Sequence, residues 1–289
     1  MTNFLLHILI LMGIYTILSV SLNFMLGYAG IISICHGAFF GIGAYAGALL
    51  ALRTGLPFGL EVVIACSITG LCGLIIAAPT LRLDEDYMSL ATYAFGVIVF
   101  TVLGNWHSVT RGPLGLPGIP RVQIFSLVFD QMWSYACLVI FFVIITLACL
   151  TSWLRSPFGK LLMAIREDQI AVSAVGKNVA FFKIVATVIS SFFAGIAGVL
   201  LAHYLTFIDP STFVIHESFI ILGMVVFGGM GTIVGPIAGA ITMVLIPEGL
   251  RFVGLPSFYA AHLRQVLFSV LIILILLKRP QGLCGKEIE

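Results

Sequence analysis

Four ionisable residues lie within or beside long apolar stretches of the sequence: His36, His203, Glu217 and Glu248. Ionisable groups are costly inside a membrane and commonly hold substrates or relay protons there. Interfacial or helix-capping roles are nevertheless favoured, because His203 and Glu217 flank a break in the apolar pattern and Glu248 follows Pro247 near the end of a run. Only His36 has a position that suggests depth, and no buried carboxylate is expected in the middle of a span.

Motifs for catalysis are missing. A phosphate-binding loop of the form GxxxxGK[ST] cradles phosphate with backbone amides and a lysine, but Gly159-Lys160, Gly176-Lys177 and Gly285-Lys286 lack the upstream glycine and the following Ser or Thr. GxSxG and HExxH are also absent, and the six cysteines show no CxxC or Cys/His ligand spacing. We therefore expect no enzymatic activity, no cofactor, no metal and no ATP hydrolysis by this chain.

Glycine spacing is the most regular pattern in the chain. Glycines four residues apart share a helix face and let two helix backbones approach closely. The sequence GxxG occurs in both halves, at Gly27–Gly30 and Gly228–Gly231, and interrupted helices in both halves indicate a transport pathway. The residues expected at such a pathway or at close helix contacts are Gly27, Gly30, His36, Gly37, Gly41, Gly228, Gly229, Gly231, Gly235 and Gly239.

The elements that must position these residues are membrane-spanning helices. The 289 residues are 61% hydrophobic and only 9% charged, with a mean hydropathy of +1.18, whereas about a quarter of a soluble domain is charged. We predict an all-α, polytopic transmembrane bundle of about eight to ten helices in one domain, 1–289, with broken or re-entrant segments within 31–52 and 217–250. The expected spans are roughly 4–26, 31–52, 60–81, 88–104, 132–153, 183–206, 217–230, 233–250 and 262–277.

Short-loop cations predict the orientation of the spans. They gather in the segment 154–183 and in the tail 278–289, so both are expected in the cytoplasm. Counting back along the spans puts the Gly/Pro-rich loop 105–131 and the N-terminus outside. The first apolar run is interpreted as a retained span because it is too long for a signal-peptide core. The cations form no basic stripe, so no nucleic-acid partner is expected.

The loop at about 154–182 contains the segment "RSPFGKLLMAIREDQIAVSAVGKNV", which carries six charged residues in this apolar chain. Ser156-Pro157 is a typical helix start, and Gly176 is a plausible stop. One amphipathic helix of about twenty residues is predicted between them. It either rests in the lipid headgroup layer or presents its surface to a soluble partner.

Five motifs, in order along the chain, resemble the LivM type of branched-chain amino-acid permease. They are "LNFMLGYAGIISICHGAFFGIGAY", "GPLGLPGIP", the charged segment above, "ILGMVVFGGMGTIVGPIAGA" and "RPQGL". Within the charged segment, "EDQIAVSAVGKN" resembles the loop of ATP-binding-cassette (ABC) importers that docks on the ATPase, although it has no Glu-Ala-Ala triplet. Arg111 stands where the family pattern usually has glycine.

The resemblance implies a permease subunit of an importer in the bacterial inner membrane, together with a second, LivH-like permease, two LivG/LivF-like ATPase subunits that use ATP, and a periplasmic solute-binding protein. The implied substrate is leucine, isoleucine or valine; urea, short amides and other amino acids remain alternatives. An ion-coupled secondary transporter and a membrane-embedded enzyme are hypotheses from other classes. The expected ATPase-coupling residues are Arg166, Asp168, Ala171, Ala174 and Gly176.

Overall fold

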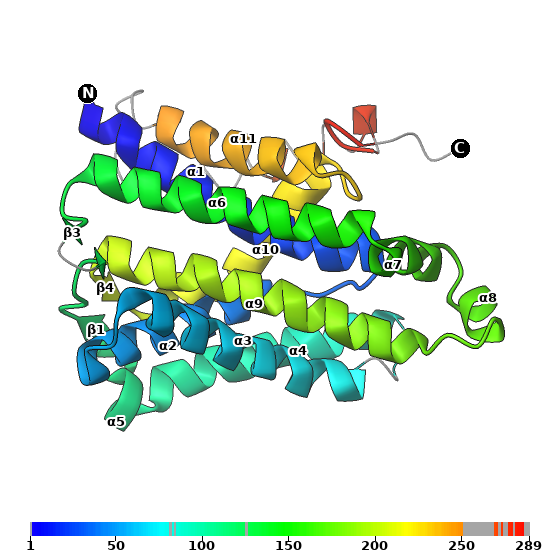
Figure 1. The fold of residues 1–289 in the computed structure, drawn as a ribbon, viewed down its shortest axis with the longest axis horizontal. Helices are drawn as coiled ribbons and strands as arrows, with labels where there is room; N and C mark the ends of the chain where they lie inside the picture. Colours follow the sequence, from blue (N-terminus) through cyan, green and yellow to red (C-terminus); the bar gives the residue numbers. More distant parts are fainter. Residues whose placement is uncertain are drawn as a thin grey trace.

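The protein is a bundle of long apolar helices (Figure 1). The computed structural model describes residues 2–80, 83, 85–124, 127–250, 269–270, 273, 277–279 and 281–285. Within this part, six helical stretches are long and apolar enough to cross a membrane, which confirms the predicted all-α polytopic class. They lie on α1 (Thr2–Asn23, continued by a π-helical turn at Phe24–Tyr28), α2 (His36–Thr54), α3 (Phe58–Thr80), α4 (Glu85–Asn105), α6 (Met132–Arg155) and α9 (Val179–Leu205).

Two shorter apolar helices complete the described bundle: α10 (Ile215–Gly228) and α11 (Val234–Leu250). They divide the predicted glycine-rich region 217–250 into two pieces separated by residues 229–233. The first glycine-rich region is also interrupted, since α2 begins at His36 and not at residue 31. Most of the predicted last span, 262–277, lies outside the described residues.

The two ends of the bundle are built differently (Figure 1). At one end lie the N-terminus, the short helix α5 (His107–Thr110) and the strand β1 (Leu116–Pro117), which pairs in antiparallel fashion with β4 (Phe207–Ile208). A second small ribbon pairs β2 (Gln123–Ile124) with β3 (Leu127–Val128). The opposite end carries α7 (Pro157–Glu167), α8 (Gln169–Ala174) and the described tail residues 281–285. The loops predicted to face opposite sides of the membrane therefore lie at opposite ends of the molecule.

The segment before β1 turns on left-handed backbone, with φ of 60° at Arg111 and 57° at Gly112. A left-handed conformation costs an L-residue about 1–2 kcal/mol, but costs glycine almost nothing. The resemblance places glycine at the position of Arg111, which fits this conformation. The loop thus keeps a glycine-like turn even though its residue there is arginine.

Helix α9 lies at the centre and packs along both α2 and α3. The approach of α9 to α2 is close because glycines face one another. A Cβ built at Gly43 would lie 2.5 Å from Cα of Gly195, and one built at Gly198 would lie 2.5 Å from the backbone nitrogen of Ala44. Small residues at helix interfaces bring backbones together where lipid supplies no hydrophobic drive for association.

The crossing of α10 and α11 uses the four-residue glycine repeat. A Cβ at Gly235 would lie 2.8 Å from the carbonyl oxygen of Gly228 and 2.6 Å from Oγ1 of Thr232, and a Cβ at Gly239 would overlap the carbonyl oxygen of Met224. The two helices therefore touch backbone to backbone. Any larger side chain at these positions must push them apart.

We expect Gly235→Leu to destabilise the protein by about 1–3 kcal/mol, the usual cost of overpacking. The matched control is Gly59→Leu in α3, since a Cβ at Gly59 meets no atom within 4 Å. The melting temperature of each variant in mild detergent is the measurement. Equal melting temperatures for the two variants would contradict close backbone packing at Gly235.

Candidate functional site

The charged segment between α6 and α9 forms two helices, so the prediction of a single helix of about twenty residues is wrong. The break falls at Asp168, whose carboxylate accepts hydrogen bonds from the backbone nitrogens of Ile170 at 2.8 Å and Ala171 at 2.9 Å. Asp168 thus caps α8. Ser156 occupies the N-cap position of α7, but its hydroxyl donates backward to the Trp153 carbonyl at 2.6 Å and caps no amide.

The two helices have a buried face and an open groove. Leu162 and Ile165 of α7 are buried against the bundle. On the exposed side, α7 and α8 border an open groove of about 390 Å³ whose lining is mostly apolar with three charged residues. It is lined by Leu161, Ala164, Glu167, Asp168, Ala171, Val172, Val175 and Lys177.

The structure distributes the five predicted coupling residues over three places. Asp168 and Ala171 line the groove. Ala174, at the end of α8, and Gly176, with a left-handed φ of 79°, are exposed beyond it. Arg166 points elsewhere. Its guanidinium donates from Nη1 to the Gly27 carbonyl oxygen, in the π-helical turn that follows α1.

The two predicted helix interruptions meet beside Arg166. The side chain of Asn23 joins them: its Nδ2 donates to the Thr232 carbonyl at 2.8 Å, and its Oδ1 accepts from the Gly231 nitrogen at 3.0 Å. We call Asn23, Gly27, Gly30, Arg166, Gly231 and Thr232 the break junction. It brings the GxxG segments from both halves of the chain to the end of the bundle that carries α7 (Figure 1).

The described part of the tail, residues 281–285, packs against the end of α10 and the start of the second interruption. The backbone nitrogen of Leu283 donates to the Phe227 carbonyl at 3.0 Å, and that of Cys284 donates to the Gly228 carbonyl at 2.9 Å. Gly229, with a φ of 113°, lies so close to this tail that a Cβ would come within 2.5 Å of the Gly285 nitrogen. The last carbonyls of α10 are therefore satisfied by the tail.

His36 lies at depth, as its position in the sequence suggested, and is fully buried. Its Nε2 is 2.8 Å from Oγ of Ser21, and that hydroxyl donates to the Leu18 carbonyl at 2.8 Å. Nε2 is therefore the donor to Ser21, and Nδ1 is an acceptor with no partner among the residues the structure describes. Because His36 contacts Ser21, which lies about two turns before the end of the first span, the non-helical residues 30–35 lead the backbone back into the bundle.

Contacts to the start of α10 involve three further predicted residues. The backbone nitrogen of Gly37 donates to Oγ of Ser218 at 2.9 Å. A Cβ at Gly41 would lie 3.0 Å from the Phe213 side chain. The half-buried carboxylate of Glu217 accepts a hydrogen bond from the Tyr15 hydroxyl at 2.6 Å, so it ties α10 to α1. The side chain of Glu248 lies outside the described part of the structure.

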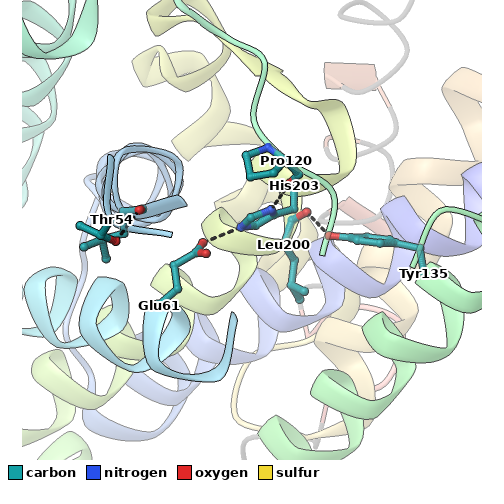
Figure 2. Close-up of polar contacts among 7 residues, drawn as sticks. Thr54, Glu61, Pro120, Tyr135, Leu200 and His203 are labelled. Atoms are coloured by element: carbon teal, nitrogen blue, oxygen red, sulfur yellow. Dashed lines mark hydrogen bonds and ion pairs between the residues drawn. The ribbon is translucent and has the colours of Figure 1, made fainter. Parts of the chain in front are cut away.

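Sequence reasoning missed Glu61, a buried carboxylate in the first turn of α3 (Figure 2). Its Oε1 lies 2.5 Å from Nε2 of His203, and both side chains are 3% exposed. Nδ1 of His203 donates to the Pro120 carbonyl at 2.7 Å. Since a carbonyl only accepts, Nδ1 carries a hydrogen, and the imidazole and carboxylate share one further proton.

The pair of Glu61 and His203 lies between two hollows at the end of the bundle that carries the small strands. One, of about 310 Å³, is lined by both residues, and the other, of about 220 Å³, is lined by His203 together with Tyr135 and Tyr204. One turn before His203, the Leu200 carbonyl accepts the Tyr135 hydroxyl at 2.5 Å (Figure 2). These bonds tie α9 to the loop at Pro120, to α3 and to α6.

We expect Glu61→Leu and His203→Leu each to lower the free energy of unfolding by up to about 3–5 kcal/mol, because each leaves a buried polar partner unpaired. The double variant should cost clearly less than the sum of the two. Unfolding in mild detergent measures all three. Arg121→Ala is the control, because it removes an exposed ion pair to Asp130 that is worth about 0–1 kcal/mol; strictly additive costs would show that Glu61 and His203 are not coupled.

A protein-family model and several known proteins each match nearly the whole chain. A family model described as "Branched-chain amino acid transport system / permease component" matches residues 4–276. The high-affinity branched-chain amino acid transport system permease protein LivM of Escherichia coli K12 is 33% identical over 93% of this chain and 67% of its own length.

Two further relatives extend the comparison. A probable LivM permease of Methanocaldococcus jannaschii is 29% identical over 97% of this chain and 93% of its own length. The permease LivH of Escherichia coli K12 is 26% identical over 95% of this chain and 92% of its own. No solved structure matches the chain. With six apolar spans in the described residues and a family match over residues 4–276, the chain belongs to the permease family of branched-chain amino acid transport systems, a family of membrane transport proteins and not of enzymes.

Proposed function

We propose that this chain is the permease subunit of an ABC importer for leucine, isoleucine and valine, and that it forms half of the translocation pathway. The observation that carries the proposal is the family match over residues 4–276, together with relatives named for branched-chain amino acid transport. Membership of this family also disfavours the alternative of an ion-coupled secondary transporter. Urea, short amides and other amino acids remain alternative substrates, and ligand screening of a co-purified binding protein distinguishes them.

We further propose a complete importer with four kinds of subunit. This chain pairs with a second, LivH-like permease, and the similarity of LivH to this chain supports two related halves around one pathway. Two LivG/LivF-like ATPases supply the energy of ATP, and a periplasmic binding protein delivers the substrate. Non-helical backbone at 30–35 and at 229–233 supports a pathway near these segments, because such backbone inside a membrane must be buried or line a cavity.

The groove between α7 and α8 is the proposed docking site for an ATPase subunit. Its lining combines apolar residues such as Ala171 and Val172 with the charged Glu167 and Lys177. A helix resting on lipid headgroups would instead turn its apolar surface toward the bilayer. Here Leu162 on one face of α7 is buried in the bundle, and the groove leaves a second apolar surface open. This arrangement supports docking of a protein.

Gly176→Asp should abolish ATPase association and uptake while leaving the protein inserted, because it adds a charged side chain beside the groove. The left-handed backbone adds a strain of about 1–2 kcal/mol to that change. The matched control is Gly118→Asp: Gly118 has a φ of 78°, Gly176 has one of 79°, and a Cβ at either position meets no atom within 4 Å. Co-purification of ATPase subunits in mild detergent is the measurement. Normal association for Gly176→Asp and Ala171→Glu would refute docking at this groove.

We propose that the α7–α8 end and the tail face the cytoplasm and that the loop 105–131 faces outward. In a cysteine-free background, Ser108→Cys should react with an impermeant thiol reagent added to intact cells, and Ser173→Cys should not. Both positions are exposed, so accessibility of the protein surface does not bias the comparison. The reverse labelling pattern would overturn the orientation and the docking proposal with it.

A further inference from the structure

We propose that Arg166 is the positioning residue that links movement of the α7–α8 loop to the two helix interruptions, so that a docked ATPase acts on the pathway through this one side chain. The inference rests on the proposed function. Arg166 precedes the last residue of α7, two residues before the break at Asp168. A change in the angle between α7 and α8 would therefore act directly on its backbone.

The contacts of Arg166 reach both interruptions. Its guanidinium donates to the carbonyl of Gly27, in the π-helical turn that ends the first span. Gly30 lies against the backbone end of the same residue, where a Cβ would be 3.2 Å from Cγ and 3.3 Å from Cα of Arg166. A Cβ on Gly231 would lie 2.7 Å from Nη1, so the guanidinium also borders the second interruption.

The chemistry of the site favours arginine. Carbonyls at the C-terminal end of a helix form the negative end of its dipole and attract a cation. The guanidinium presents five donors in a rigid plane, whereas lysine offers one flexible ammonium. Gly30 and Gly231, with φ of 68° and 73°, supply backbone turns without side chains, and this leaves space for that plane.

The side chain of Asn23 makes the two interruptions move as one. It bonds the Gly231 nitrogen and the Thr232 carbonyl from within α1, four residues before Gly27. Withdrawing Arg166 from the Gly27 carbonyl would therefore remove a tie from the first segment, to which Asn23 joins the second. Lys160, on the same helix, is exposed and makes no side-chain hydrogen bond or ion pair to any described residue, so its charge alone provides no such link.

The test uses the complete importer, with both permeases, both ATPases and the binding protein, reconstituted in liposomes. Arg166→Ala, Arg166→Lys and the control Lys160→Ala are compared for bound ATPase, basal ATP hydrolysis, stimulation by leucine-loaded binding protein, and leucine uptake. We expect Arg166→Ala to keep its ATPases and basal hydrolysis, to lose the stimulation and to lower uptake roughly tenfold or more. Arg166→Lys should be intermediate, and Lys160→Ala should behave as wild type.

Three outcomes would overturn the inference. Normal stimulation and uptake in Arg166→Ala would show that the link is unnecessary. Loss of bound ATPases would make Arg166 a docking residue, and a proportional fall of all activities with protein yield would make it a folding residue. Failure of the proposed function appears differently, because the wild-type complex would then bind no ATPase or transport no leucine.

Discussion

Backbone groups freed by a broken helix must find hydrogen-bond partners inside a membrane, and this requirement governs the rest of the structure. At the break junction, Asn23 serves both the Gly231 nitrogen and the Thr232 carbonyl, and Arg166 serves the Gly27 carbonyl. The tail serves the end of α10 through Leu283. The interruptions are thus held by groups from three parts of the chain: Asn23, Arg166 and the tail at residues 283–284.

The polar groups that hold the structure together differ between the two ends of the bundle. At the end with the small strands, the buried pair of Glu61 and His203 fixes the loop around Pro120 with mutually satisfied, tightly packed groups. At the other end, the break junction includes the exposed side chain of Arg166, and it lies beside an open groove. A buried, paired end and an end with an exposed tie suit a protein in which motion enters from the α7–α8 side.

The sequence predicted the features that depend on composition and local spacing. Apolar runs of sufficient length located the spans, and GxxG located both interruptions. It did not predict the split at Asp168, because a cap competes with helix continuation through local hydrogen bonds that periodicity does not report. The partner of Arg166 is 139 residues away and that of Glu61 is 142 residues away. Neither pairing leaves a local signal, and a single carboxylate in an apolar first turn does not disturb the pattern of a span.

Hydrogen–deuterium exchange of the protein in lipid nanodiscs tests most directly whether the two interruptions form one unit. Asn23→Ala removes the side chain that joins them, and Asn105→Ala removes a matched amide whose Nδ2 donates within its own helix, to the Thr101 carbonyl at 2.8 Å. The account predicts that Asn23→Ala accelerates exchange in residues 24–35 and 229–235 together, with 112–124 unchanged, and that Asn105→Ala accelerates neither segment. Faster exchange in only one of the two segments, or in neither, would contradict the account.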